Sequence, residues 1–378
     1  MKKKYLFLTF IFFYYSALYA GIPSGYYNTA TGTGSTLKTQ LYNIIKDHSS
    51  ITYDQLWTSF PSTDTKANGK VWDVYSDIPN DTPPYEFTFI SNQCGTYDSE
   101  GDCYNREHSF PSSWFGGEVS PMYTDLFQIY PTDGYVNGQR SNYPFGEVGS
   151  ASWTSQNGSK KGTCSYTGYT GIVFEPIDEY KGDFARSYFY MATRYENVIS
   201  TWYANSTEAD AVLQNNSFPV FETWFLNMLG EWSVNDPVSQ KEIDRNEAIY
   251  AIQGNRNPYI DHPEYVYSVW GVGQINTGTI ETNRPTPSGT TLNFGTVNTT
   301  ATKSLHVKTT DITGDLSVTV TGEMFSTSTV TLTVLQANSG YDLTVTYTPT
   351  ASGTHTGTLT ISGGGLNPEY SVSLSGKR

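Results

Sequence analysis

Basic residues, cysteines and histidines are scarce in this chain of 378 residues, and each scarcity limits the classes of function that the protein can have. Lysine and arginine number 22 against 36 acidic residues, for a formal net charge of −14 at pH 7. A protein that coats nucleic acid through broad positive charge is therefore disfavoured. Three cysteines are too few for a small disulfide framework. Five histidines leave few candidates for acid–base chemistry near neutral pH.

Aromatic residues, by contrast, are abundant. The chain has 30 Tyr, 19 Phe and 8 Trp, and 37% of it is hydrophobic. This composition supplies a large packed core and excludes a largely disordered or collagen-like chain. The length allows two or three domains.

The first 20 residues have the pattern of a signal peptide. Three lysines follow Met1, an apolar and aromatic run spans 5–15, and small residues precede a cleavage site after Ala20. A retained anchor is the alternative, but the run is short for a membrane span. We expect export with cleavage, no membrane span in the remaining chain, and a secreted, periplasmic or cell-surface location in a bacterium.

Composition changes near residue 285, where a chain rich in Trp, Tyr, Asn and Asp gives way to Thr, Ser, Gly and Val. The last segment alternates apolar and polar residues, which predicts half-buried strands. The segments that alternate include 316–321, 330–335, 341–347, 358–361 and 370–374. About seven such strands are typical of an immunoglobulin-like β-sandwich. We therefore predict a first domain over 21–273, a linker over 274–288 that is rich in Pro and Gly, and a sandwich over 289–378 with an unknown partner.

The first domain mixes helical and strand patterns, which makes the expected fold class α+β. Apolar residues three and four apart predict helices, and short apolar runs predict strands. The helices are expected near 36–46, 183–202, 219–229 and 238–252, and the strands at 71–75 and 87–90. We expect the protein to be a monomer.

Export permits disulfides, and the three cysteines allow three pairings. Cys94 and Cys103 are close in sequence and would close one small loop, which leaves Cys164 unpaired. Pairing of Cys164 with either of them is the alternative. A structural bridge is favoured over a catalytic thiol.

His108 differs from the other histidines by its neighbours, in the segment Asn105–Pro111. An imidazole can act as a general base near neutral pH, and the carboxylate of Glu107 can hold a hard cation. Adjacent residues of a strand point to opposite faces. The two side chains can therefore share a site only where the strand ends, and Pro111 with its serine neighbours indicates such an end.

In a second segment, 125–142, Tyr130-Pro131 follows a short apolar strand. Thr132 or Asp133 can cap a helix there, from which Asn137 would project. Its amide oxygen is a neutral ligand for hard cations. Arg140 lies three residues further along the same helical face and could reach a phosphate.

These two segments together resemble the bacterial endonuclease I family of the His-Me finger (ββα-metal) nucleases. The resemblance rests on Asn-Arg-Glu-His-Ser-Phe-Pro from residue 105 and Tyr-Pro-Thr-Asp-Gly-Tyr-Val-Asn-Gly-Gln-Arg from residue 130. It continues through 173–176, 181–186 and 253–263 and covers roughly 25–272. Several separated motifs in the right order make it specific.

The resemblance implies a domain whose core is a β-hairpin and a helix around one divalent cation. By this resemblance His108 is the general base, and Glu107 and Asn137 are the metal ligands. Mg²⁺ is the first candidate, with Ca²⁺ and Mn²⁺ as alternatives. The implied activity is largely sequence-nonspecific hydrolysis of DNA, with RNA as a second candidate, to 5′-phosphate and 3′-hydroxyl ends. Family members often have His-Asn where Phe127-Gln128 stands here, and Gln128 would keep the hydrogen bond to the imidazole.

The charge of the first domain opposes a nucleic-acid substrate. Residues 21–286 carry 15 basic and 31 acidic groups, a net charge of −16. Either Arg106, Arg140 and Arg186 form a local basic groove, or binding is weak, metal-assisted and sensitive to salt. For Arg186 an ion pair is favoured over a phosphate contact.

Two other function classes are weaker. A surface-binding protein with an inactive nuclease domain is opposed by the presence of Glu107, His108 and Asn137. A metalloprotease or glycosidase is opposed by the absence of a His-Glu-x-x-His segment and of any distinct carboxylate pair.

Overall fold

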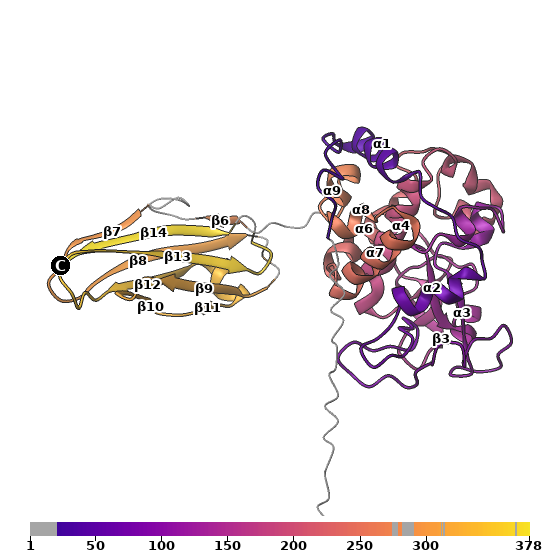
Figure 1. Ribbon diagram of the computed structural model, residues 1–378, viewed down its shortest axis with the longest axis horizontal. Helices are drawn as coiled ribbons and strands as arrows, with labels where there is room; N and C mark the ends of the chain where they lie inside the picture. Colours follow the sequence, from indigo (N-terminus) through magenta and orange to yellow (C-terminus); the bar gives the residue numbers. More distant parts are fainter. Residues whose placement is uncertain (1–20, 274–278, 282–290, 311, 313, 367–368) are drawn as a thin grey trace, which may run out of the picture. The chain divides into compact units, whose positions relative to one another are not determined.

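A computed structural model describes residues 21–273, 279–281, 291–310, 312, 314–366 and 369–378 (Figure 1). The chain divides into two compact units, residues 1–274 and 275–378. The expected signal peptide, 1–20, lies outside the described residues. In the part of the chain that is described, no helix has the length and apolarity needed to cross a bilayer.

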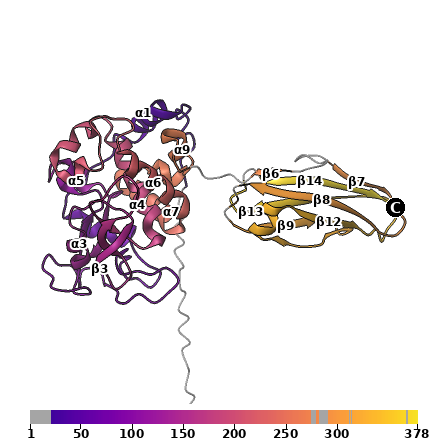
Figure 2. The same cartoon turned by 180° about the vertical axis from the view of Figure 1, so that it is seen from behind.

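The N-terminal unit has more helix than strand, and several of its helices pack around a central one. The longer helices are α1 (Gly34–Ile45), α2 (Gln55–Thr63), α4 (Lys181–Arg194), α6 (Thr223–Asn235) and α7 (Gln240–Gln253). Shorter ones are α3 (Gly134–Arg140), α5 (Thr207–Asp210), α8 (Pro258–Asp261) and α9 (Tyr265–Trp270). Figures 1 and 2 show α4 among its neighbours, and α4 packs directly on α1, α6 and α8. The helix expected over 183–202 ends at Arg194, and a 3₁₀ helix follows over Ile199–Asn205.

All 14 residues of α4 are buried, although its sequence has a polar side. Burial of charges is tolerated because partners on other elements neutralise them. Asp183 accepts a hydrogen bond from Lys241 on α7 at 2.7 Å. Arg186 binds both carboxylate oxygens of Glu242, also on α7. The apolar stripe therefore identifies α4 as a core helix, and Asp183 and Arg186 join it to α7 through buried ion pairs.

A β-hairpin followed by a short helix forms one end of the unit. Strand β1 (Tyr104–His108) pairs antiparallel with β2 (Ile129–Asp133), and His108 lies opposite Ile129. Helix α3 begins directly after β2. Asp133 is its N-cap and accepts a hydrogen bond from the Val136 amide at 2.8 Å, which satisfies one of the free amides of the first turn.

A second antiparallel sheet contains β3 (Val148–Thr154), β4 (Lys160–Cys164) and β5 (Ile172–Glu175) in that order. The strands expected at 71–75 and 87–90 are wrong. These segments are irregular, although Val71, Val74, Tyr75 and Phe87 are all buried in the core. The apolar pattern located core residues correctly, but few neighbours lie close enough to complete a ladder of backbone hydrogen bonds.

The C-terminal unit consists of two sheets that share one apolar core. One sheet has the order β10-β12-β8-β6 and the other β11-β9-β13-β14-β7. The strands are β6 (Thr279–Glu281), β7 (Thr291–Thr296), β8 (Ala301–Thr310), β9 (Leu316–Thr321), β10 (Phe325–Thr327), β11 (Thr331–Leu332), β12 (Tyr341–Tyr347), β13 (Thr354–Gly363) and β14 (Tyr370–Lys377). Every pairing is antiparallel except that of β14 with β7.

Alternation predicted most of these strands, and burial alternates along β9, β12 and β14. Two expectations need correction. The segment 330–335 contributes only the two residues of β11, because Thr333 begins helix α10 (Val334–Ser339) with a capping box. Residues 279–281 of the expected linker form β6, which pairs with β8.

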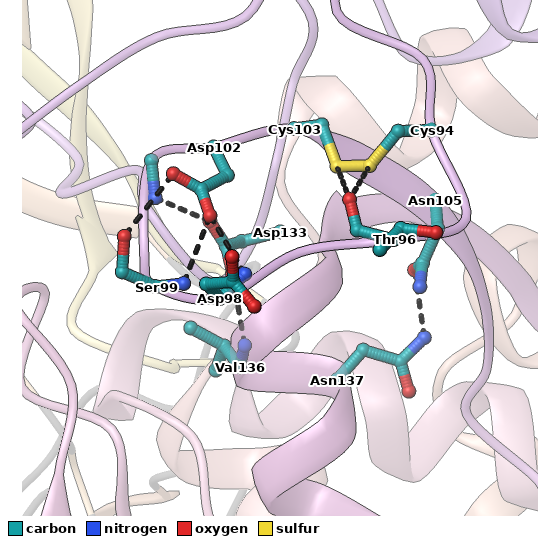
Figure 3. Close-up of a disulfide and its surroundings, with 11 residues drawn as sticks. Cys94, Thr96, Asp98, Ser99, Asp102, Cys103, Asn105, Asp133, Val136 and Asn137 are labelled. Atoms are coloured by element: carbon teal, nitrogen blue, oxygen red, sulfur yellow. Dashed lines mark hydrogen bonds between the residues drawn. A yellow bond between two sulfur atoms is a disulfide. The ribbon is translucent and has the colours of Figure 1, made fainter.

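A disulfide lies beside the hairpin (Figure 3). It joins Cys94 to Cys103, and Cys164 is a free, buried cysteine. The loop that it closes contacts the start of α3, because the Gly101 amide donates to Asp133 at 2.8 Å and the Gly134 amide donates to the Cys103 carbonyl at 2.9 Å.

Removing this bridge is expected to destabilise the N-terminal unit. Replacing Cys94 and Cys103 together by serine should lower the free energy of unfolding by about 2 to 3 kcal/mol, because the unfolded chain regains the freedom of the open loop. Urea unfolding measures the change. Cys164→Ser under the same conditions controls for loss of a thiol, and an unchanged urea midpoint in the double variant would contradict the expectation.

Candidate active site

A small polar cavity of about 130 Å³ opens where β1 ends and α3 passes it. Its lining residues are Arg106, Glu107, His108, Pro111, Ser112, Asn137, Arg140, Ser141 and Asn142. The structure thus brings together His108, Glu107, Asn137 and Arg140 from two segments about 30 residues apart. Gln128 and Arg186 are not part of the lining.

His108 is the last residue of β1, and its ring is fixed on two sides. Its Nε2 lies 3.1 Å from the Tyr123 carbonyl oxygen. A carbonyl only accepts hydrogen bonds, so Nε2 carries the proton and Nδ1 has a free lone pair. The Tyr123 ring stacks on the imidazole with centroids 4.8 Å apart. Burial, aided by Arg140 and Arg106, lowers the pKa of His108 to about 4, so the ring is neutral at pH 7.

Glu107 is buried, with 2% of its surface exposed. Its Oε1 accepts hydrogen bonds from the Tyr75 hydroxyl at 3.0 Å and from Arg140 Nη1 at 2.9 Å. Within the described part of the chain, Oε2 accepts none. Burial raises the pKa of Glu107, and the Arg140 guanidinium opposes that shift. One oxygen of the carboxylate is therefore held by the protein, and the other is available to a ligand in the cavity.

Asn137 is held in the same manner (Figure 3). It projects from α3, and its Nδ2 donates to Asn105 Oδ1 at 2.8 Å. Because this bond uses the amide nitrogen, Oδ1 is left to act as an acceptor or a ligand. Asn105 and Glu107 are two apart in β1, so both lie on the face that α3 covers.

The free atoms of Glu107 and Asn137 fit a hard divalent cation. One carboxylate oxygen and one amide oxygen facing a polar cavity are typical ligands of Mg²⁺, which keeps several waters when protein ligands are few. No three His, Cys, Asp or Glu side chains gather as a metal cluster among the residues that the structure describes. A soft-metal or closed structural zinc site therefore does not fit these residues.

Arg140 does not occupy the role expected from the sequence. Its side chain is 1% exposed and binds Glu107, the carbonyls of His108 and Ser109, and the Tyr188 hydroxyl. A guanidinium with these partners holds the chain at the end of β1 and is not free to bind a phosphate directly. In place of the phosphate contact expected from the sequence, Arg140 has a structural role.

Gln128 and Arg186 also require correction. Gln128 is fully buried and donates to the Met122 carbonyl at 2.9 Å, whereas Nε2–H of His108 donates to the Tyr123 carbonyl. Arg186 is 1% exposed and paired with Glu242 in the helical core, so it is not a substrate-binding residue. The ion pair that the sequence favoured for Arg186 is confirmed.

Arg106 lines the cavity, but its guanidinium is engaged with aromatic rings. Its Cζ lies 3.5 Å from the centroid of Tyr53 and 4.4 Å from that of Trp57, and its Nη1 donates to the Tyr53 carbonyl at 2.9 Å. Tyr53 stacks on Tyr123 with centroids 4.6 Å apart. A continuous series of planar groups thus leads from Trp57 to His108. Because Arg106, Arg140 and Arg186 are all engaged within the fold, they do not form the basic groove considered from the sequence.

Sequence reasoning missed the residues that orient the site, namely Asn105, Tyr75 and Tyr123. Asn105 had a signal, because a strand places residues two apart on one face. Tyr75 and Tyr123 had none, since they reach Glu107 and His108 only through the tertiary fold.

Comparison with known proteins gives consistent results. A family model described as Endonuclease I matches residues 33–264. An extracellular ribonuclease of Bacillus amyloliquefaciens is 38% identical over 251 residues, which is 65% of this chain and 78% of that protein. An extracellular ribonuclease of Bacillus subtilis (strain 168) is 33% identical over 252 residues, with the same coverage of both chains. A periplasmic deoxyribonuclease of Aeromonas hydrophila is 26% identical over 150 residues, 38% of this chain and 50% of that one.

The bond from Asn137 to Asn105 yields a prediction about cation affinity. Asn105→Ala should weaken Mn²⁺ binding about 10-fold, because Asn137 then turns freely and no longer presents Oδ1 to the cavity. Isothermal titration calorimetry measures the affinity. Asn43→Ala, at an exposed position of α1, is the matched control. Equal Mn²⁺ affinities in Asn105→Ala and the wild type would show that another contact orients Asn137.

Proposed function

This chain is a member of the endonuclease I family and an endonuclease, and from that premise we propose that it hydrolyses both RNA and DNA with one divalent cation on Glu107 and Asn137 and His108 as general base. The observation that carries the proposal is that three residues lining one cavity each keep an acceptor atom that the described part of the chain leaves without a hydrogen bond. These atoms are Nδ1 of His108, Oε2 of Glu107 and Oδ1 of Asn137.

The proton transfer begins at His108. Its unprotonated Nδ1 removes a proton from the water that attacks phosphorus, and the Tyr123 carbonyl continues to accept from Nε2–H as the ring becomes positive. Arg140 holds Glu107 in place throughout. A cation on Glu107 and Asn137 would supply positive charge that offsets the negative charge growing on the phosphate and on the leaving oxygen. Mg²⁺ fits this site best, with Ca²⁺ and Mn²⁺ as alternatives.

Attack by water requires no 2′-hydroxyl, and this supports a substrate range that includes DNA and RNA. The relatives that match 65% of the chain are named ribonucleases, and the Aeromonas relative is named a deoxyribonuclease. Hydrolysis by this route leaves 5′-phosphate and 3′-hydroxyl ends. Attack by a 2′-hydroxyl would leave 2′,3′-cyclic phosphate instead, so the products discriminate between the two routes.

The protein is secreted, as the extracellular and periplasmic relatives and the signal-peptide pattern indicate. We assign β1, β2 and α3 to a ββα-metal core, because an antiparallel hairpin and the following helix carry the proposed base and ligands. The two facing sheets of the C-terminal unit support an immunoglobulin-like sandwich. The proposed catalytic domain remains 21–273. The proposed sandwich consists of 289–378 together with β6, which pairs with β8. The proposed state of the protein is a monomer.

Cleavage should depend on the cation and on His108. Wild-type protein should degrade plasmid DNA and single-stranded RNA with Mg²⁺ and lose both activities in EDTA. His108→Ala should lose roughly 10²-fold or more in kcat, because the attacking water then has no base. Gel assays of both substrates measure this, with end-labelled RNA to identify the termini.

Controls separate chemistry from folding in this experiment. His108→Ala should retain the unfolding midpoint and Mn²⁺ affinity of the wild type, whereas Glu107→Gln should lose affinity for Mn²⁺. Full activity of His108→Ala would remove this residue from the role of base. Absence of any EDTA-sensitive cleavage by the wild type would instead support a binding protein with an inactive nuclease domain.

The stacking of Tyr123 on His108 predicts a positioning effect. Tyr123→Ala should lower kcat about 10-fold with little change in KM, because the imidazole loses the ring that fixes its plane. Tyr123→Phe should restore most of the lost kcat, since it keeps the ring and removes only a hydroxyl that contacts Glu118 at 3.5 Å and Tyr53. Equal losses in both variants would show that the ring does not position His108.

A further inference from the structure

Most cations of the N-terminal unit are neutralised by carboxylates, and the exceptions are therefore informative. Among the described residues 21–273, all but four of the lysines and arginines lie within 4.0 Å of a carboxylate oxygen. The four are Lys46, Lys70, Lys161 and Arg194. In a unit with a strong negative charge, these are the cations that no carboxylate neutralises, although Arg194 is only 7% exposed.

Two of the four, Lys46 and Arg194, line one pocket of about 370 Å³. It lies between the ends of α1 and α4 and the segment Val119–Met122. Arg194 donates from Nε to His48 at 2.7 Å, and its Cζ lies 4.7 Å from the centroid of the Tyr195 ring. Neither contact neutralises its charge.

The opposite side of the pocket holds Lys46, whose Nζ donates to Asn43 Oδ1 at 3.0 Å. The Tyr42 ring also lines the pocket, 5.6 Å from that nitrogen, and offers a face on which a base can stack. Asp47 is the one acid of the lining, and it is exposed. Helix C-termini favour cations in general, which can explain why Lys46 and Arg194 stand at the ends of α1 and α4. It does not explain why a pocket lies between these two side chains.

The pocket adjoins the segment that orients the proposed base. Val119, Ser120, Pro121 and Met122 form its wall, and the next residue, Tyr123, binds Nε2 of His108 and stacks on its ring. A strand whose scissile phosphate occupies the cavity at His108 would have to pass this segment to reach Lys46.

We propose that this pocket binds one nucleotide of the substrate strand away from the scissile bond, with its phosphate on Lys46 and Arg194. The proposal rests on the proposed function. An arginine fork and a lysine ammonium suit a phosphate, and a tyrosine face suits a base of any sequence. Long single strands would then bind more tightly than dinucleotides, and their binding would weaken with salt.

A matched pair of lysine variants tests the proposal. In EDTA, Lys46→Gln should raise the Kd for a fluorescein-labelled single-stranded oligonucleotide of about 20 residues roughly 5-fold and reduce the salt slope by about 0.7. Lys70→Gln is the control. Lys70 also lacks a carboxylate partner, is half-buried like Lys46, and lies outside the pocket lining, so both variants change the net charge equally. Equal Kd values in the two variants would overturn the proposal.

A second variant changes the pocket without removing a cation. Asn197→Asp is nearly isosteric at an exposed position of the lining and adds a negative charge beside the proposed phosphate. It should weaken oligonucleotide binding in the same direction as Lys46→Gln. Binding equal to the wild type would count against a phosphate in this pocket.

Substrate length and a free nucleotide provide the remaining tests. Lys46→Gln should raise KM for the oligonucleotide and leave KM for a dinucleotide as in the wild type, since a dinucleotide is too short to reach the pocket. Equal increases for both would place Lys46 at the catalytic cavity and overturn the proposal. An effect of AMP on dinucleotide cleavage that Lys46→Gln abolishes would identify an effector site instead. If the oligonucleotide bound in a manner that depends on Lys46 but was not cleaved, the proposed function would be refuted and the proposed binding pocket would not.

Discussion

The buried ion pair between Glu107 and Arg140 is the contact on which the candidate site depends. Adjacent residues of a strand point to opposite faces, so Glu107 and His108 could not share a cavity if β1 continued. Arg140 reaches across from α3 and binds Glu107 together with the carbonyls of His108 and Ser109. It therefore holds the chain where it leaves the strand and fixes the distance between hairpin and helix. Loss of one partner from such a pair costs about 3 to 5 kcal/mol, because the other charge stays buried.

Other basic residues of the N-terminal unit are used in the same way, in buried ion pairs, and this explains why few of them can contact a nucleic acid. Arg186, Lys241 and Arg245 are buried in ion pairs that join α4, α7 and the loop after α2. These cations stabilise the fold and are buried together with their acidic partners, so few basic side chains remain to contact a substrate. In the proposed function, binding of nucleic acid would depend on the proposed cation, on aromatic faces and on the few lysines and arginines without a carboxylate partner.

Sequence patterns predicted what depends on local order and missed what depends on distant partners. His108, Glu107 and Asn137 came from two motifs and line one cavity, and alternation predicted β9, β12 and β14. The roles of Arg140 and Gln128 were wrong, because a side chain's partner is set by the tertiary fold and not by its neighbours in sequence. The segments 71–75 and 87–90 were read as strands for a related reason, since an apolar residue of the core has the same pattern whether or not its backbone joins a sheet.

Each group at the site has one atom bound by the protein and a second one left free. Tyr123 occupies Nε2 of His108, Tyr75 and Arg140 occupy Oε1 of Glu107, and Asn105 occupies Nδ2 of Asn137. Without these partners each side chain would have to lose rotational freedom when a cation or substrate arrives. Because the partners lie in the hairpin and the helical core, folding itself sets which atoms face the cavity. Under the proposed function this arrangement would be preorganised for a cation and an attacking water, through partner atoms that touch neither of them.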